Sequence, residues 1–351
     1  MNHIALIVTA GSGSGARIAA PFLLPAIRTA AAAVCEEIRE VTEEELDEAL
    51  SGRAGDFVLV LDGAMPFLTA DDCRLLMECS RRTGKTAVAK DGGILPRCMA
   101  PGATQTQTVV LGKDALTSAT EPVALAEALA ALRGRKADAL MGSGVYLLDP
   151  GHTYIEPDVC VGAGTVIHPN CTLTGGTVIG ENCVLLPGCR IHGSRIGDGV
   201  TIESSILTEC SVGNHTAVGP FAYLRPGAQV GSHCRVGDFV EIKNSVIGDG
   251  TKVSHLTYVG DSDLGRNINL GCGVVFVNYD GKKKHRTSVE DNAFIGCNVN
   301  LVSPVHVGQG AYVAAGSTIT EDVPGGALAV ARERQTVKVG WAEKRKTEGK
   351  L

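Results

Sequence analysis

Hydrophobic residues in the second half of the chain recur at every sixth position. The aliphatic positions run from 155 to 191, from 212 to 242 and from 289 to 319, and a glycine commonly follows them. A helix repeats every 3.6 residues and the strands of an ordinary β-sandwich alternate every two, so neither explains this spacing. A coil with three flat faces does, because each face uses six residues and points one aliphatic side chain inward. The repeat therefore predicts a solenoid of stacked coils, about nine of them between residues 155 and 320.

The first half of the chain, up to about residue 150, follows a different pattern. Short apolar runs at 4–11 and 57–63 read as strands, and apolar spacing predicts helices over 70–82 and 122–140. Strands that alternate with helices indicate an α/β domain with a parallel sheet, which could cover the exposed first coil of the solenoid. The chain then divides into an α/β domain, a helical linker, a solenoid and a tail, at 1–118, 119–150, 151–323 and 324–351.

Composition narrows the possible functions. The net charge of −6 argues against general nucleic-acid binding, and the low aromatic content of 4% suits a narrow core of Val, Ile and Leu. The 12 cysteines form no Cys-x-x-Cys pair, and residues 1–10 lack the basic start of a signal peptide, so we expect reduced thiols in a cytoplasmic protein. The most apolar run, 19–34, is too short to cross a bilayer. We expect no metal site, because His255, His285 and His306 are too dispersed.

Counting the coils places residues of adjacent layers side by side. Arg225 and Lys243 each follow an aliphatic residue and are 18 positions apart, so the two cations share an edge. Like charges in this position repel unless an anion lies between them, which indicates a phosphate-sized site; two solvated surface cations are the alternative. The same count places Cys272 beside His255 in the next coil, and Tyr258 at the end of that same face. A lone surface histidine is usually inert, but His255 lies one coil beyond the candidate anion site, which favours a functional role.

The rhythm stops at Val277–His285, which reads VNYDGKKKH. Thirteen positions separate the inward-pointing residues on either side, where the repeat uses six, so the excess must leave the solenoid as a loop. We expect the loop to leave close to His255, with Asn278 and Tyr279 at its root and the lysines farther out. The alternative is an ordinary solvated run of charges.

Longer motifs in the second half resemble one family closely. They are GPFAYLRPG (219–227), VGDFVEIKNS (236–245), SHLTYVGD (254–261), NINLGCG (267–273), VNYDGKKKH (277–285), FIGCN (294–298) and ITEDVPGGALAVAR (319–332). They resemble the acetyltransferase domain of the bacterial bifunctional UDP-N-acetylglucosamine pyrophosphorylase and glucosamine-1-phosphate N-acetyltransferase family, over about residues 120 to 342. The resemblance implies a left-handed parallel β-helix that works as a homotrimer with sites between subunits. It also implies acetyl transfer from acetyl-CoA to the amine of glucosamine-1-phosphate, by direct attack on the thioester in a ternary complex and without a metal.

The resemblance further implies roles for individual residues. His255 matches the general base, for which an imidazole with a pKa near neutral is suited, and Asn278 matches the residue that orients amine and base. Arg225 and Lys243 match ligands of the sugar phosphate, and Lys284 matches a lysine that reaches the site of an adjacent subunit. The full substrate-binding set is Arg225, Lys243, Tyr258, Asn269, Tyr279 and Lys284. The acetyl-CoA-binding set is Cys272, Cys297, Ala315 and Arg332.

The chain departs from the family on the acyl-donor side. Cys272 stands beside the base where the family has a small residue, and Cys297 stands near the thioester where the family usually has a serine, a stronger hydrogen-bonding group. Residues 333–335 also differ from the family's pattern. These changes leave room for a different acyl group or a slower enzyme.

The α/β domain is about half as long as the family's uridyltransferase domain. A glycine-rich loop that would cradle phosphate survives in part as AGSGSGAR at 10–17, but no lysine precedes Lys85. Ala64 stands where the family has a metal-binding aspartate, with Asp62 two positions early, and a segment is missing between about 90 and 120. We therefore expect a truncated, degenerate Rossmann-like nucleotidyltransferase domain without uridyltransferase activity. Mg²⁺ would be needed only if that activity is retained.

Four hypotheses follow from these patterns. The leading one is acetyl transfer to glucosamine-1-phosphate in the synthesis of UDP-N-acetylglucosamine, a precursor of the cell wall. The second keeps the chemistry but changes the amino-sugar phosphate or the acyl group. The third is a non-catalytic scaffold or regulatory trimer, and the fourth is a retained bifunctional uridyltransferase.

Overall fold

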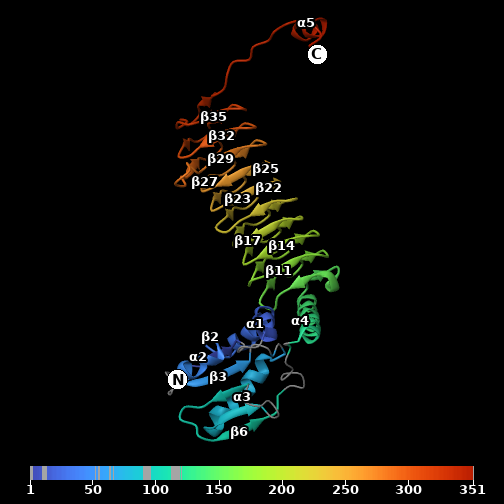
Figure 1. Cartoon of the computed structure of the whole chain (residues 1–351), viewed down its shortest axis with the longest axis vertical. Helices are drawn as coiled ribbons and strands as arrows, with labels where there is room; N and C mark the ends of the chain where they lie inside the picture. Colours follow the sequence, from blue (N-terminus) through green and yellow to red (C-terminus); the bar gives the residue numbers. More distant parts are fainter. Residues whose placement is uncertain are drawn as a thin grey trace. The chain divides into compact units, whose positions relative to one another are not determined.

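The computed structural model describes residues 3–9, 14–51, 53, 56–62, 65, 67–89, 96–111, 119 and 121–350. These residues form two compact units, Met1–Glu209 and Cys210–Leu351. The first unit holds an α/β domain and the first coils of a solenoid, and the second holds the remaining coils and a C-terminal segment (Figure 1).

The α/β domain is built on a six-stranded sheet with the order β2-β1-β3-β5-β4-β6. Its strands are β1 (His3–Val8), β2 (Glu37–Val41), β3 (Phe57–Asp62), β4 (Thr86–Ala89), β5 (Arg97–Met99) and β6 (Thr106–Val109). Its helices are α1 (Ser14–Ala32), α2 (Glu43–Ser51) and α3 (Ala70–Thr83). Alternate residues of β1 enter two cores, because Ala5 and Ile7 pack with residues of α1 and α3 while Ile4 and Leu6 pack with residues of α2. Burial on both faces explains the unbroken apolar run at the start of the chain.

The expected strands and helices of this domain are confirmed, and the expected parallel sheet is confirmed for part of its strands. β1 pairs in parallel with β2 and β3, whereas β5 is antiparallel to both β3 and β4. Only seven residues separate the end of β4 from the start of β5. A parallel pair needs a crossover of about a dozen residues or more, so this short connection reverses the strand.

Helix α4 (Pro122–Gly142) covers the first coil. It contacts β7 and β8, and the Lys136 ammonium donates hydrogen bonds to the carbonyls of Pro157 at 2.9 Å and Val159 at 2.5 Å. Burial lowers the pKa of Lys136. The first coil of a solenoid exposes its apolar interior, and this helix provides the cover that the interior needs.

The coils are triangular, and each contributes one strand to each of three parallel sheets of 11, 10 and 9 strands, near the predicted number of about nine coils. Face 1 consists of β7 (Tyr146–Leu147), β10 (Val166–Ile167), β13 (Val184–Leu185), β16 (Thr201–Ile202), β19 (Ala217–Val218), β22 (Arg235–Asp238), β25 (Lys252–His255), β28 (Asn269–Leu270), β31 (Phe294–Ile295), β34 (Tyr312–Val313) and β36 (Leu328–Ala329). Face 2 consists of β8 (Tyr154–Ile155), β11 (Thr172–Thr174), β14 (Arg190–His192), β17 (Ile206–Thr208), β20 (Tyr223–Leu224), β23 (Glu241–Lys243), β26 (Tyr258–Gly260), β29 (Val275–Val277), β32 (Asn300–Val302) and β35 (Thr318–Ile319). Face 3 consists of β9 (Cys160–Val161), β12 (Val178–Ile179), β15 (Arg195–Ile196), β18 (Ser211–Val212), β21 (Gln229–Val230), β24 (Val246–Ile247), β27 (Ser262–Leu264), β30 (Thr287–Val289) and β33 (His306–Val307). A short 3₁₀ helix, η1 (Pro150–His152), precedes β8, and α5 (Trp341–Thr347) lies near the C-terminus.

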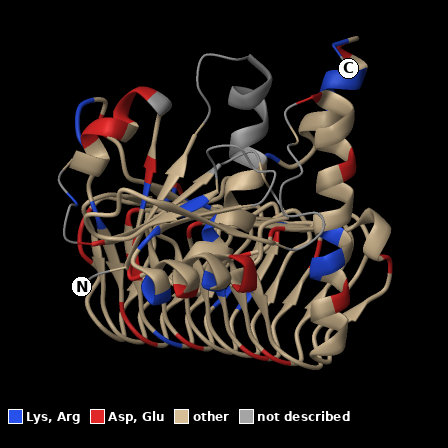
Figure 2. Cartoon of the chain, turned by 90° about the horizontal axis from the view of Figure 1, so that it is seen from below, with Lys and Arg blue, Asp and Glu red and all other residues tan. Residues whose placement is uncertain are grey.

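The six-residue rhythm is the spacing of the buried residues. On face 2 of the second unit, the inward residues Leu224, Ile242, Val259 and Phe276 are fully buried and in register in successive coils. Most charged residues of the coils are exposed or half-buried, with Asp261 a buried exception. Acidic and basic positions are interspersed along the coils on the side drawn in Figure 2. The register fixes which outward side chains are neighbours, and that determines the site below.

Gly237 keeps two coils in contact at the end of face 1. A Cβ at this position would lie 1.9 Å from the carbonyl oxygen of Ser254. Gly237→Ala is therefore expected to destabilise the protein by about 1–3 kcal/mol, the usual penalty for overpacking, and to lower the thermal unfolding temperature. The matched control is Gly134→Ala in α4, where nothing lies within 4 Å and a gain of about 1 kcal/mol in helix propensity is expected. Equal melting temperatures for the two variants would contradict the close approach of the coils.

Candidate active site

The corner between faces 1 and 2 carries one functional side chain in each of several consecutive coils. Strands β25, β28, β31 and β34 pair in parallel, and the residues two positions past their inward aliphatics are His255, Cys272, Cys297 and Ala315. Backbone hydrogen bonds fix this alignment, from the amide of Gly273 to the His255 carbonyl at 3.3 Å and from Asn298 to Cys272 at 2.8 Å. The predicted proximity of Cys272 and His255 is confirmed, because the two residues occupy equivalent positions in adjacent coils.

His255 has a carboxylate partner that the sequence analysis missed. Its Nδ1 lies 2.5 Å from an Asp238 oxygen, and the hydrogen bond from His255 lowers the pKa of Asp238. An ionised carboxylate can only accept, so Nδ1 is the donor in this hydrogen bond, and in a neutral imidazole the lone pair is then on Nε2. The His255 side chain is 50% exposed, which leaves Nε2 open to a substrate. The signal was present in the sequence, because Asp238 precedes His255 by 17 residues, about one coil.

The corner between faces 2 and 3 carries the cations. Arg225 and Lys243 lie in register in adjacent coils, as predicted, and the ammonium of Lys284 joins them. The hydrogen bond and the charge of Lys243 lower the pKa of Lys284. We name Arg225, Lys243 and Lys284 the cation cluster.

Two carboxylates of the same chain lie against the cation cluster, which the sequence analysis did not foresee. Arg225 Nη1 pairs with Glu241 at 2.7 Å, and Lys243 Nζ lies 3.6 Å from Asp261. Three cations against two carboxylates leave one net positive charge. The repulsion is thus partly relieved within the chain, and an incoming anion still meets a positive surface.

Asp261 organises the polar side chains under the cation cluster. It is 7% exposed and accepts hydrogen bonds at 2.6 Å from the amides of both Asn244 and Asn278. Burial opposes ionisation of Asp261, but those hydrogen bonds and the charge of Lys243 outweigh it and lower its pKa. Asn278 also lies 3.4 Å from the Tyr258 hydroxyl, so Tyr258 belongs to this side of the site.

Two expected placements are wrong. Tyr258 does not end the face of His255: it begins β26 on face 2, because the corner at Leu256 separates them. The loop at Val277–His285 does not leave close to His255 but at the far end of face 2, beside the cation cluster, because it follows β29. Both errors come from treating a corner as part of a face.

The loop is a small ordered hairpin rather than a loose charge run. Tyr279 and Lys284 form an isolated antiparallel bridge, and the Tyr279 hydroxyl bonds the carbonyl of Gly281 at 2.8 Å. Inside the turn, one Asp280 oxygen accepts the amides of Lys282 and Lys283 at 2.7 and 2.6 Å. The hairpin thereby holds Lys284 toward Lys243 of its own chain, while its reach to a neighbouring subunit stays a prediction.

Asp280→Ala is expected to loosen this hairpin. Hydrogen exchange of the Lys282 and Lys283 amides should accelerate about tenfold or more, since both lose a charge-assisted partner. The amides of Lys283 and Lys282 and the His285 ring lower the pKa of Asp280, so its contribution is complete above the unfolded value of about 3.9 and is lost as the pH falls toward the folded value. Exchange in the wild type should therefore show no Asp280-linked change between about pH 5 and 8. Unchanged protection in the variant would contradict this role.

Two other predicted site residues, Asn269 and Arg332, lie away from the cation cluster. Asn269 lies on face 1, paired with Lys252 and Phe294, away from the cation cluster on the far corner of face 2. Arg332 lies beyond Ala315, and its Cδ would be 3.7 Å from a Cβ on Gly316. One chain alone thus does not unite the whole predicted substrate-binding set.

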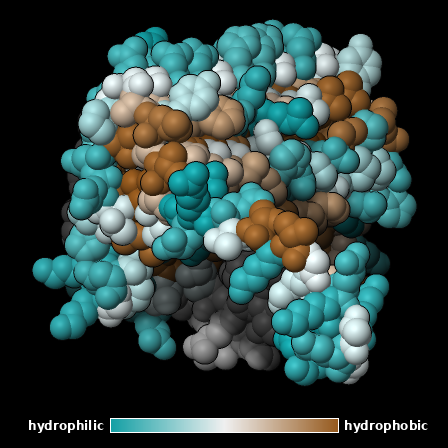
Figure 3. Space-filling view, turned by 90° about the horizontal axis from the view of Figure 1, so that it is seen from above, coloured by the Kyte–Doolittle hydropathy of each residue, from teal (hydrophilic) through white to brown (hydrophobic). Residues whose placement is uncertain are grey.

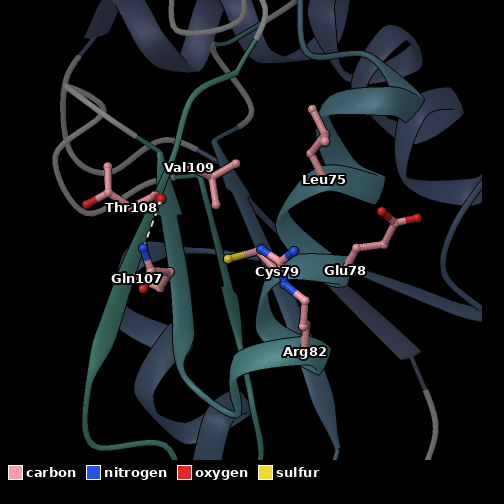
Figure 4. A pocket seen from close by; sticks show the side chains of 7 residues that line it. All are labelled: Leu75, Glu78, Cys79, Arg82, Gln107, Thr108 and Val109. Carbon is pink, nitrogen blue, oxygen red and sulfur yellow. Dashed lines mark hydrogen bonds between the residues drawn. The ribbon is translucent and has the colours of Figure 1, made fainter.

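The α/β domain offers no comparable constellation among the residues that the structure describes. The glycine-rich loop at 10–13, Ala64 and the side chain of Asp62 lie outside the described residues. A groove of about 320 Å³ between α3 and β6 is lined by Leu75, Glu78, Cys79, Arg82, Gln107, Thr108 and Val109 (Figure 4). Its lining side chains show no nucleophile–base pair, and we assign it no chemistry. Within the described ranges, no group of three or more His, Cys, Asp or Glu residues could hold a metal ion.

Comparisons with known proteins agree with the repeat. The family model for the bacterial transferase hexapeptide (six repeats) matches residues 209–244 and 286–321. The bifunctional protein GlmU of Acetivibrio thermocellus is 56% identical over 223 residues, covering 64% of this chain and 48% of that protein. GlmU of Clostridioides difficile is 50% identical over 223 residues, covering 64% and 49%. The repeat region of the chain is similar to GlmU proteins. The chain spans about half the length of these GlmU relatives.

A solved UDP-N-acetylglucosamine acyltransferase of Francisella novicida is 19% identical, with a TM-score of 0.37, over 58% of this chain and 73% of that one. The hexapeptide match and the GlmU relatives agree on a transferase-type hexapeptide solenoid over the repeat region. No helix that the structure describes is long and apolar enough to cross a membrane.

Proposed function

We propose that the chain transfers the acetyl group of acetyl-CoA to the amine of glucosamine-1-phosphate. The observation that carries this proposal is the placement of two chemical groups at the two edges of face 2. The Asp238–His255 pair supplies a base at one edge, and the net positive cation cluster supplies an anion site at the other. A phosphorylated amino sugar is a substrate that needs both.

The reaction uses His255 as a general base. The neutral amine attacks the thioester carbonyl, the new C–N bond forms, and Nε2 of His255 takes the proton that the nitrogen loses. The C–S bond then breaks, and the proton passes to the departing CoA sulfur. Asp238 keeps the imidazole in the tautomer that can accept and stabilises the imidazolium that forms. No covalent acyl-enzyme is needed, because the thioester is already reactive and the protein supplies position and deprotonation.

The donor lies along the corner of His255. Cys272, Cys297 and Ala315 follow His255 in successive coils about 4.8 Å apart, and Arg332 lies beyond them. The extended arm of acetyl-CoA fits such a line, with its thioester at His255 and its anionic end toward Arg332.

A second copy of the chain completes the site. Asn269 lies on a different face from the cation cluster, so a shared site between two solenoids would bring it into reach. Exposed apolar side chains also need cover: hydrophobic patches lie on the surface in Figure 3, and Phe221, Phe239 and Leu256 are each more than half exposed. A shared site needs at least a second copy, and the family resemblance makes the expected assembly a homotrimer.

Light scattering at assay concentration is expected to give the mass of three chains. A monomer that is fully active would contradict the shared site. A monomer without activity would instead indicate that assembly is required for function.

The test of the proposal is a matrix of acceptors and donors on the purified chain. Glucosamine-1-phosphate with acetyl-CoA is expected to be the best pair. Cys272 and Cys297 favour one competing candidate, a different acyl group or amino-sugar phosphate, which would appear as a faster pair elsewhere in the matrix. Activity with no pair would favour a scaffold. An arm with UTP and N-acetylglucosamine-1-phosphate is expected to yield no UDP-N-acetylglucosamine, because we propose that the short α/β domain has lost uridyltransferase activity.

A further inference from the structure

We propose that Cys272 and Cys297 form a reversible disulfide that blocks the acyl-donor corner, so that a thiol-oxidising environment switches the site off. The pair is a property of this chain, since two cysteines stand in adjacent coils directly after His255. The part of the proposal that concerns activity rests on the proposed acetyl transfer, while the formation of the bond does not.

The register places the two thiols as neighbours. Leu270 pairs with Ile295, so Cys272 and Cys297, two positions later, are equivalent residues of adjacent coils. The amide of Asn298 donates to the Cys272 carbonyl at 2.8 Å. Neighbouring parallel strands lie about 4.8 Å apart, which is within the Cα separation of about 4.4–6.8 Å that disulfides span.

The backbone holds this spacing. Gly271 precedes Cys272, and a Cβ on Gly271 would lie only 2.5 Å from the Cys297 amide nitrogen. On the other side of Cys297, a Cβ on Gly296 would lie 2.5 Å from the Ala315 nitrogen. The two coils are therefore in direct contact where the cysteines stand.

The two thiols are also accessible, and neither is held by a hydrogen bond to a described residue. Cys297 is exposed and Cys272 is half-buried, and neither sulfur hydrogen-bonds to any residue that the structure describes. By contrast, Cys171 and Cys189 are register neighbours in adjacent coils too, but they are buried and both bond the carbonyl of Leu186. Access of an oxidant distinguishes the first pair from the second.

The disulfide forms by thiol–disulfide exchange. A low-molecular-weight disulfide such as oxidised glutathione takes two electrons from the pair. The Cys272 and Cys297 sulfurs join, the two thiol protons pass to the released thiolates, and two glutathione thiols leave. An exposed disulfide is readily reduced again, so the step is reversible by a dithiol.

The Cys272–Cys297 disulfide would block binding of the acyl donor and would leave the general base His255 unchanged. It draws both side chains together on the corner between His255 and Ala315, along which we place the thioester. The oxidised chain should then keep its fold and its Asp238–His255 pair but lose access for the acyl donor.

The experiment uses the full chain in glutathione buffers of graded ratio, with free thiols alkylated before digestion. Trypsin separates the pair into the peptides 267–282 and 287–332, so the disulfide appears as these two linked. We expect the linked form to rise with oxidised glutathione and to vanish with dithiothreitol. The buried thiols of Cys171 and Cys189 should react with the alkylating reagent only after the protein is denatured. A glutathione adduct on either thiol in place of the linked peptides, or two free thiols throughout, would overturn the pair.

Activity measured on the same samples tests the consequence. In the wild type, the residual acetyl-transfer rate is expected to equal the unlinked fraction. In Cys297→Ser, the ratio of the rates in oxidising and reducing buffer should be one, whatever the variant's own rate. A linked wild type that keeps its full rate would overturn the switch. If the reduced wild type itself is inactive, the proposed function fails, and the linked peptides still decide whether the pair exists.

Discussion

His255→Ala is expected to lower kcat for acetyl transfer by about 10²- to 10⁴-fold, the range that a positioned general base contributes. The amine must lose a proton as it attacks, and Nε2 of His255 is the acceptor that the Asp238 hydrogen bond leaves open. KM for glucosamine-1-phosphate should change much less, because the cation cluster lies at the other edge of face 2. Steady-state kinetics on wild type and variant measure both quantities.

The control separates loss of the base from loss of the fold. The His255 side chain is half exposed, so its removal should leave the unfolding temperature nearly unchanged. Asp238→Asn keeps the size of the side chain but can present its amide to Nδ1, which favours the wrong tautomer, so kcat should fall although His255 is still present. A His255→Ala variant with the wild-type rate would remove the imidazole from the mechanism.

Arg225→Ala and Lys243→Ala are each expected to raise KM for glucosamine-1-phosphate by about 10- to 100-fold, since each removes a charge-assisted contact to the phosphate. The effect should be larger than for an isolated surface pair, because each variant also removes a cation that faces a carboxylate, Glu241 or Asp261. Initial rates over a range of substrate concentrations give the change in KM.

Glucosamine without phosphate is the matched substrate for this prediction. The wild type should use it poorly, and the two variants should use it no worse than the wild type does. An equal loss with both acceptors would place Arg225 and Lys243 in the support of the fold rather than in phosphate binding.

The sequence predicts most of the solenoid because its signal is a simple count. A period of six fixes which residues point inward, and a fixed number of residues per coil then stacks Arg225 on Lys243 and Cys272 on His255. The same count could have found Asp238, one coil before His255. An aspartate at a corner of the solenoid is common, however, so Asp238 carries no distinctive signal of its own.

Other features do not follow from counting. The Tyr258 and loop placements failed because a six-residue repeat gives the number of faces but not the residue at which the chain turns, and Leu256 turns the corner with φ of 47°. The contacts that make Asp261 the centre of a network depend on side-chain directions after that corner. The reversed strand β5 depends on the length of a connection, which an α/β pattern alone does not weigh.

The most direct test of the central claim is the identity of the product. Purified chain is incubated with acetyl-CoA and glucosamine-1-phosphate, without UTP, and the sugar product is identified by mass spectrometry and NMR. The account predicts N-acetylglucosamine-1-phosphate and one equivalent of free CoA from the wild type, with the rate lost in His255→Ala. Absence of an N-acetylated sugar phosphate, or its formation at the same rate without His255, would contradict it.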